Sequence, residues 1–344
     1  MKQNKITDAY SSLNPLTPER MRKIIPEIKK YSLPGLIIGE EVWKGTIYGD
    51  SKVGSIVYDA TFRGKPAVCK VYAIRQKINE SRILGDFNAQ NQSEIISVPV
   101  VFDARAWDIE GEYGYLITEK TEGKKIFTPP YATEEQMMEF CAFFDDYKKN
   151  AIVKPWMPSP KMRTPVYMAG RVLKWTGISK DKGMLKKEDY RPYVRKFYTF
   201  LLRNLPSTLK IPMVFGHGHL GPNEIVKTED GKYVLMANMM WGYRPEWYEI
   251  GFLIWTCLLA VRDTSCSVSD AYHRIVAPWM RHLQKMDAAK KDPLFSRKVA
   301  ILLIERFIGA ILLDVGAHDD FKGKDREYFR PLLSMFQELF KLYA

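Results

Sequence analysis

The chain has 344 residues, 46% hydrophobic and 13% aromatic, which excludes general disorder and predicts one or two globular units. Its amino terminus is polar, without the apolar core of a secretory signal, and its longest apolar run, residues 250–261, is too short to span a bilayer. The four cysteines lie far apart and form no CxxC pair (Cys69, Cys141, Cys257 and Cys266). We therefore expect free thiols and a cytoplasmic protein without a membrane span.

The net charge of +12 is concentrated in one segment. Residues 151–210 hold 14 Lys and Arg against three Asp and Glu, an excess of +11. Such a charge run is typical of a solvated helical face, and it also suits an anionic partner such as a phosphate, a nucleic acid or a lipid surface.

The first 125 residues predict a helix followed by a β-rich region. Thr17 and Pro18 suit the N-cap and first turn of a helix over 16–31. Further elements are predicted in this order: strands over 55–62 and 66–73 joined by a turn at 63–65, a helix over 77–92, and strands over 98–108 and 113–123.

After Gly123 the pattern becomes mostly helical, with two short apolar runs, 212–220 and 232–237, around a loop. Helices are predicted near 134–148, 187–204, 246–262, 268–287, 295–314 and 325–342. The order predicts an α+β fold with a small β lobe and a larger helical lobe.

Two groups of residues carry candidate chemistry. In the β region, Gly54 and Ser55 precede a predicted strand, Lys70 lies in the next strand, and Glu80 follows on the predicted helix. A glycine lets backbone approach a phosphate closely, and a strand lysine held by a helix glutamate supplies a fixed positive charge. In the helical region, GHGHLGPNEI (216–225) precedes MMWGYRPEWYEIGFLIW (239–255).

With these segments in this order, the chain resembles the aminoglycoside phosphotransferase and choline kinase branch of the kinase-like fold over roughly residues 40–330. The resemblance implies an N-terminal extension (1–35), a nucleotide-side lobe (36–122) and a helical lobe (123–344) with a catalytic-loop-like segment at 214–240. It implies ATP as the nucleotide. It places Gly54, Ser55, Lys70, Glu80 and the hinge-like Glu119 on the nucleotide side, and gives His217 and Glu249 structural roles.

The three residues that define the chemistry of that family differ here. His219 stands where the catalytic Asp is expected, Glu224 where a metal-binding Asn is expected (Asn223 is displaced by one), and Ala237 where the metal-binding Asp is expected. A one-residue slip puts Asn238 at that last position. Mg²⁺ prefers oxygen ligands in octahedral geometry, which an alanine cannot supply and for which Glu224 is a partial substitute. The sequence therefore argues against Mg²⁺ binding.

Several interpretations stay open at this stage. The leading one is a pseudokinase that binds a nucleotide, an anionic ligand or a protein without efficient phosphoryl transfer. A second is an active phosphotransferase with a rearranged site in which Glu224 binds metal and His219 acts as base. A third is a nucleic-acid-binding module that uses the basic segment. A metal site of His217, His219 and Glu224 is a further alternative. The basic segment disfavours a cationic substrate such as choline or an aminoglycoside.

Overall fold

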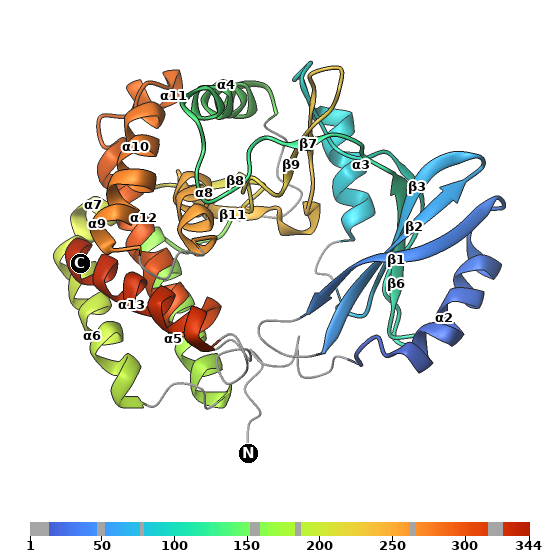
Figure 1. Ribbon diagram of the computed structural model, residues 1–344, viewed down its shortest axis with the longest axis horizontal. Coiled ribbons are helices and arrows are strands. Elements are labelled where there is room, and N and C mark those ends of the chain that lie inside the picture. The colour runs from blue at the N-terminus through green and yellow to red at the C-terminus, as the bar shows by residue number, and fades with distance from the viewer. Residues whose placement is uncertain are drawn as a thin grey trace. The chain divides into compact units, whose positions relative to one another are not determined.

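The computed structural model describes residues 14–46, 52–75, 79–151, 159–182, 187–261, 266–315 and 326–344. The chain divides into two compact units (Figure 1). Unit 1 contains residues 1–89 and 97–122, and unit 2 contains residues 90–96 and 123–344. Unit 1 is built on an antiparallel sheet and unit 2 is mainly helical, which confirms the predicted α+β class.

Unit 1 contains a five-stranded sheet in the order β1-β2-β3-β6-β5, with antiparallel neighbours throughout. The strands are β1 (Leu36–Thr46), β2 (Val53–Phe62), β3 (Lys65–Tyr72), β5 (Val101–Arg105) and β6 (Gly114–Glu119). The β2–β3 hairpin closes at Arg63 and Gly64, whose φ angles are 50° and 77°. Positive φ at both positions gives the tight turn that the sequence predicts there.

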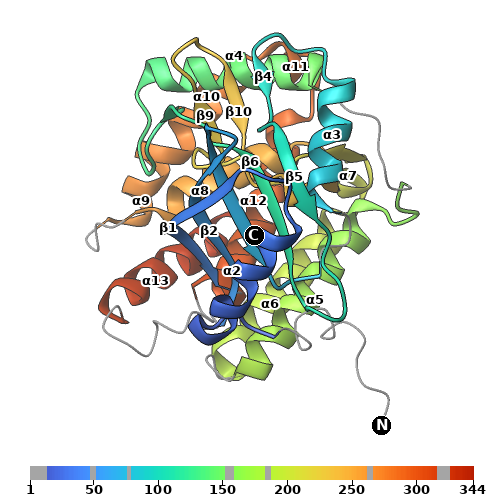
Figure 2. The same cartoon turned by 90° about the vertical axis from the view of Figure 1, so that its right-hand side faces the viewer.

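Two helices flank this sheet, α2 (Pro18–Tyr31) and α3 (Glu80–Gln90), and they lie on opposite sides of it (Figures 1 and 2). Thr17 caps α2 by accepting a hydrogen bond from the backbone N–H of Arg20. Alternate side chains of β2 and β3 pack with α2 in one apolar cluster (Met21, Ile24, Ile28, Ile56, Tyr58, Ala60, Phe62, Ala67, Cys69 and Val71 among its members). The predicted N-terminal extension therefore contributes its helix to the core of unit 1.

Unit 2 has two small sheets that carry the catalytic-loop-like segment. One has the order β4-β10-β9-β7 and the other pairs β11 with β8. The strands are β4 (Ile96–Ser97), β7 (Lys124–Lys125), β8 (Met213–Gly216), β9 (Ile225–Lys227), β10 (Tyr233–Leu235) and β11 (Gly242–Pro245). β8 and β9 are thus the two ends of the loop at residues 217–224.

Helices make up the rest of unit 2, and α12 packs against α5, α6, α8 and α13 (Figure 1). The helices are α4 (Glu134–Asn150), α5 (Thr164–Lys182), α6 (Lys187–Arg203), α7 (Leu205–Leu209), η1 (Asn238–Met240), α8 (Tyr248–Leu259), α9 (Val268–Ala271), η2 (Tyr272–Val276), α10 (Ala277–Leu283), α11 (Asp287–Lys290), α12 (Phe295–Gly309), η3 (Ala310–Asp314) and α13 (Arg326–Tyr343).

Three predicted elements differ from the structure. The sequence predicts no helix over α5, where Pro165 and two glycines, Gly170 and Gly177, weaken the local signal. The single helix predicted over 268–287 is interrupted by one π-helical turn, η2. The helix predicted to begin at 246 begins at Tyr248, because residues 242–245 pair with β8 as a strand. No helix among the described residues is long and apolar enough to cross a membrane.

Candidate functional site

On the nucleotide side, Lys70 and Glu80 form a close ion pair in unit 1. Lys70 Nζ lies 2.6 Å from Glu80 Oε2, and the two side chains are 18% and 7% exposed. Lys70 faces α3 because its neighbours in β3, Cys69 and Val71, point to the opposite, α2-covered face. The pairing that the sequence predicts is present, and it fixes the lysine side chain on the α3 side of the sheet.

Gly54 and Ser55 lie inside β2, which corrects the expectation that they precede the strand. Ser55 pairs with Gly45 on one side and with Tyr72 on the other. The Gly54 carbonyl accepts a hydrogen bond from the Ala73 N–H at 2.9 Å. The turn between β1 and β2, residues 47–51, lies outside the described residues, so a phosphate-covering loop there stays a prediction.

Glu119, the hinge-like residue, ends β6 and has its carboxylate engaged. Its Oε1 accepts the backbone N–H of Val100 at 3.0 Å, and its own N–H donates to the Val100 carbonyl at 2.9 Å. These two hydrogen bonds connect the end of β6 to Val100, the residue before β5. The side chain of Glu119 is therefore used in holding the chain at this point.

In unit 2, a buried polar group holds the beginning of the 217–224 loop. Glu249 Oε1 accepts hydrogen bonds from the Gly218 N–H and the Tyr147 hydroxyl, both at 3.0 Å. The Tyr147 oxygen in turn accepts the His217 N–H at 2.8 Å. Burial raises the pKa of Glu249, although these donors oppose the shift. The loop start is thus fixed by side chains from α4 and α8, with Glu249 in the structural place that the resemblance implies.

His217 is a buried neutral side chain. It is 0% exposed, and its Nε2 lies 2.7 Å from the Met236 carbonyl oxygen, to which it donates. Burial is the main cause that lowers its pKa to about 3, and the charges of His219 and Arg244 add to this effect. Its ring links the loop to the strand end before Ala237.

At the position of the catalytic Asp, His219 lies beside Glu224. His219 Nδ1 is 3.4 Å from Glu224 Oε1, and its ring packs on Phe252 with the ring centroids 4.3 Å apart. Glu224 Oε2 is buried and has no hydrogen-bond partner among the residues that the structure describes. Asn223, the displaced amide, accepts a hydrogen bond from Lys125 Nζ at 2.7 Å through Oδ1. The structure brings His219 and Glu224 together, and the amide oxygen of Asn223 is directed to a lysine.

The position of the metal-binding Asp is occupied by a methyl group. Ala237 has a left-handed backbone, with φ 55° and ψ 38°. Asn238, the alternative under a one-residue slip, is 2% exposed. Its amide nitrogen donates to the Leu235 carbonyl at 2.6 Å, and its amide oxygen accepts from Trp241 Nε1 at 3.1 Å. Both ends of that amide are used internally, so neither register supplies a metal ligand.

The three positions offer few ligands for Mg²⁺. Of the three positions, Glu224 alone offers a carboxylate, where this ion favours one or two carboxylates together with phosphates and water. Over the residues that the structure describes, no group of three His, Cys, Asp or Glu side chains is placed to hold a metal ion. The alternative metal site of His217, His219 and Glu224 is therefore not formed among these residues.

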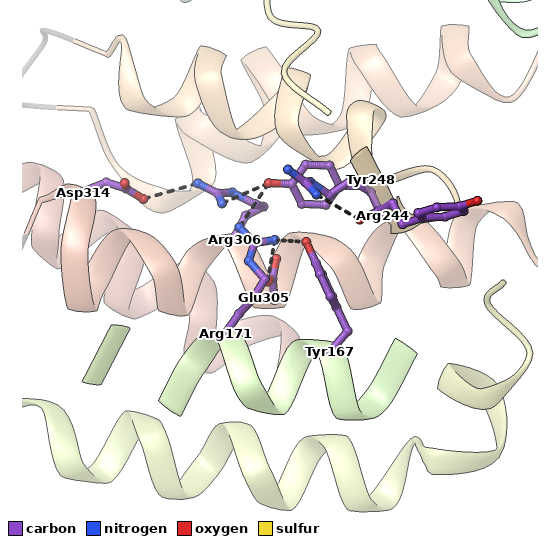
Figure 3. A network of polar contacts seen from close by, with 8 residues as sticks. Tyr167, Arg171, Arg244, Tyr248, Glu305, Arg306 and Asp314 are labelled. Atoms are coloured by element: carbon purple, nitrogen blue, oxygen red, sulfur yellow. Dashed lines mark hydrogen bonds and ion pairs between the residues drawn. The ribbon is translucent and has the colours of Figure 1, made fainter. Parts of the chain in front are cut away.

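Next to the loop, unit 2 holds an arginine cluster that the sequence analysis missed (Figure 3). We use this name for Tyr167 and Arg171 of α5, Arg244 of β11, Tyr248 of α8, Glu305 and Arg306 of α12, and Asp314 of η3. Arg171 Nη1 lies 2.9 Å from Glu305 Oε1, and Arg306 Nη2 lies 3.3 Å from Asp314 Oδ2. The Tyr248 hydroxyl accepts from Arg171 at 3.2 Å and from Arg306 at 3.4 Å.

The cluster shifts the pKa values of its members. Burial would raise the pKa of Tyr248, but Arg171 and Arg306 outweigh it and lower the pKa. Burial opposes the charge of Arg171, yet Glu305 and the two tyrosines raise its pKa well above the usual value. For Asp314 burial prevails over the nearby arginines and raises the pKa. A mostly buried set of charges therefore lies close to His219, since both Arg306 (Cζ 5.7 Å from the ring centroid) and His219 approach the ring of Phe252.

Part of the basic segment at 151–210 is thus internal. Arg171 belongs to the arginine cluster and is paired with a carboxylate, so its charge is not available on a solvated face. Lys196, also in the segment, donates to the Lys341 carbonyl at 3.0 Å in an exposed hydrogen bond. The interpretation as a uniformly solvated helical face is wrong for Arg171.

We compared the chain with known proteins. No protein-family model matches the sequence, and among curated proteins none is significantly similar. Solved structures do match: aminoglycoside phosphotransferase APH(4)-Ia has 10% sequence identity and a TM-score of 0.60, with 95% of this chain and 100% of that chain covered. The chain has the kinase-like fold of aminoglycoside phosphotransferases and choline kinases.

Two further solved structures share this kinase-like fold. A thermostable mutant of the same phosphotransferase, in a ternary complex with AMP-PNP and hygromycin B, has 10% identity and a TM-score of 0.60 over 93% of this chain and 97% of that one. Choline kinase LicA from Streptococcus pneumoniae has 13% identity and a TM-score of 0.56 over 94% of this chain and 98% of that one. The resemblance that the sequence motifs indicate is therefore confirmed at the level of the fold.

Proposed function

We propose that this kinase-like chain is a pseudokinase: it binds a nucleotide or another anionic ligand and does not transfer phosphate efficiently. The observation that carries the proposal is the joint replacement at His219, Glu224 and Ala237, together with the inward-turned amide of Asn238. Phosphoryl transfer depends on positioning and on neutralising charge, most of which divalent metal supplies. A site that lacks the metal ligands loses that contribution.

Nucleotide binding is supported by the Lys70–Glu80 pair and by the fold. A lysine held by a helix glutamate is placed to contact α- and β-phosphates in this fold. A structural neighbour is a complex with AMP-PNP. We infer that ATP is the nucleotide, bound through Lys70 and the start of β2 at Gly54 and Ser55.

A second candidate function is an active phosphotransferase with a rearranged site. The observation that favours it is the proximity of His219 to Glu224, whose second oxygen has no partner. A histidine beside a carboxylate is suited to act as a general base. This candidate ranks second because Glu224 is the one carboxylate at the three positions, so the metal would have a single protein ligand there.

ATP turnover in the presence of Mg²⁺ separates the two candidates. We expect the wild type to release no phosphate above the protein-free background, and Lys70→Ala and Glu224→Ala to behave alike. Lys65→Ala, which removes an exposed lysine of the same strand, is the matched control. Wild-type turnover at about 1–100 s⁻¹, as active kinases show, with loss in the Lys70 and Glu224 variants but not in the Lys65 variant, would establish the second candidate instead.

A further inference from the structure

Arg244 is the one member of the arginine cluster whose charge has no carboxylate partner among the described residues. Arg171 pairs with Glu305, and Arg306 pairs with Asp314. Arg244 therefore adds a positive charge to the cluster without an ion pair of its own, and it acts on the Glu249 carboxylate only by opposing the rise in pKa that burial causes. A guanidinium without a close counterion is suited to bind an anionic ligand.

The Arg244 guanidinium lies directly against the 217–224 loop. A Cβ built on Gly218 would be 3.2 Å from Arg244 Nε, and one built on Gly242 would be 3.1 Å from Arg244 Nη1. The glycines therefore leave room for this side chain. The cation is held between the loop and the segment after Ala237, the two places where the catalytic acids are missing.

The hydrogen bonds of Arg244 fix its plane but leave donors free. Nη1 donates to the Tyr243 carbonyl at 2.9 Å and Nη2 to the Met240 carbonyl at 3.4 Å. An arginine has five N–H donors. Three of the five thus have no acceptor in the part of the chain that the structure describes, and the residue is partly exposed.

We propose that Arg244 binds the charged group of an oxyanion ligand, a phosphate or a carboxylate, beside the 217–224 loop and without a divalent cation. A pre-oriented guanidinium binds such groups through two parallel charge-assisted hydrogen bonds. Its position repels a cationic ligand, so the site differs in charge preference from one for choline. The inference rests on the proposed function, because it assumes that the 217–224 loop still lines a ligand-binding site.

The test is isothermal titration of the full chain with pyrophosphate and, separately, with citrate, in EDTA. We expect at least one of the two anions to bind the wild type, and the tighter one identifies the charged group. Arg244→Gln is expected to weaken that binding roughly tenfold or more, because it removes the positive charge. Arg244→Lys is expected to weaken it several-fold, because lysine keeps the charge but cannot donate two parallel hydrogen bonds. Arg274→Gln, which removes an exposed cation of η2, is expected to change binding less than about twofold.

Three results would overturn the inference: neither anion binds, Arg244→Gln binds as the wild type does, or Arg274→Gln loses as much as Arg244→Gln. If Arg244→Gln fails to fold, Arg244→Lys decides, and binding equal to the wild type then contradicts the proposal. ATP turnover is measured independently. An active enzyme with an Arg244-dependent anion site refutes the pseudokinase proposal alone, and an inactive chain without anion binding refutes the inference alone.

Discussion

Replacing Glu305 with glutamine is expected to lower the free energy of unfolding by about 3–5 kcal/mol. Glu305 is 0% exposed, and its carboxylate lies 2.9 Å from the Arg171 guanidinium. A neutral amide would leave Arg171 without its counterion in a mostly buried cluster, and burial of an unpaired charge costs more than the pair contributes. Urea unfolding followed by tryptophan fluorescence measures the change.

The matched control is Glu338→Gln, because Glu338 also accepts from a cation, Lys341, at 2.6 Å but lies on the surface. Exposed pairs contribute less than about 1 kcal/mol. The double variant Glu305→Gln with Arg171→Met removes both charges and is expected to recover part of the loss. If Glu305→Gln proves no more destabilising than Glu338→Gln, the description of the arginine cluster as a buried ion-pair network is wrong.

Acidification is expected to destabilise unit 2 through His217. Its pKa is lowered from 6.5 to about 3, so the stability that this neutral imidazole contributes is present above pH 6.5 and is lost as the pH falls towards 3. Between about pH 6.5 and about pH 4.5, the free energy of unfolding is expected to fall by about 3 kcal/mol through this group. The raised pKa values of Glu249 and Asp314 oppose the trend, since those groups favour the folded state on protonation.

The contribution of His217 is isolated by comparing pH profiles. His217→Gln keeps an N–H donor but has no titrating group, so its free energy of unfolding is expected to fall less between pH 7 and about 4.5 than that of the wild type. His273→Gln, at an exposed histidine, should keep the wild-type slope. Equal slopes for the wild type and His217→Gln would show that His217 does not titrate as a buried neutral group.

Local patterns predict the fold and the frame of the site well. The alternation in β2 and β3 places Lys70 and Cys69 on opposite faces, and the Thr17 cap and the Arg63–Gly64 turn are visible in the sequence. The motif GHGHLGPNEI gives the loop, and the segment after it gives Glu249, which accepts from Gly218. The cap, the turn and the strand alternation depend on residues that are neighbours in the sequence. The loop and Glu249 belong to motifs whose spacing the fold preserves.

The arginine cluster could not be predicted because its members come from three stretches far apart in the sequence, 167–171, 244–248 and 305–314. In the sequence, Arg171 is one of many positive charges in the basic segment. The helical pattern around it is too weak to predict α5. Glu305 and Arg306 stand in an apolar run that indicates only a core helix. Their meeting at Tyr248 is a property of tertiary packing, which periodicity does not report. The inward turn of Asn238 is local, but periodicity does not reveal it either, because it depends on the left-handed backbone at Ala237 and on the hydrogen bond from Trp241.

We propose that a nucleotide pocket persists in this chain while the metal site is lost. Thermal unfolding of the wild type with ATP, in EDTA and in excess Mg²⁺, tests this proposal. A ligand that binds only the folded state at about 100 times its dissociation constant stabilises by about 2.7 kcal/mol. We predict that ATP raises the melting temperature by the same few degrees in both buffers. A rise that occurs only with Mg²⁺, or no rise in either buffer, would contradict the claim.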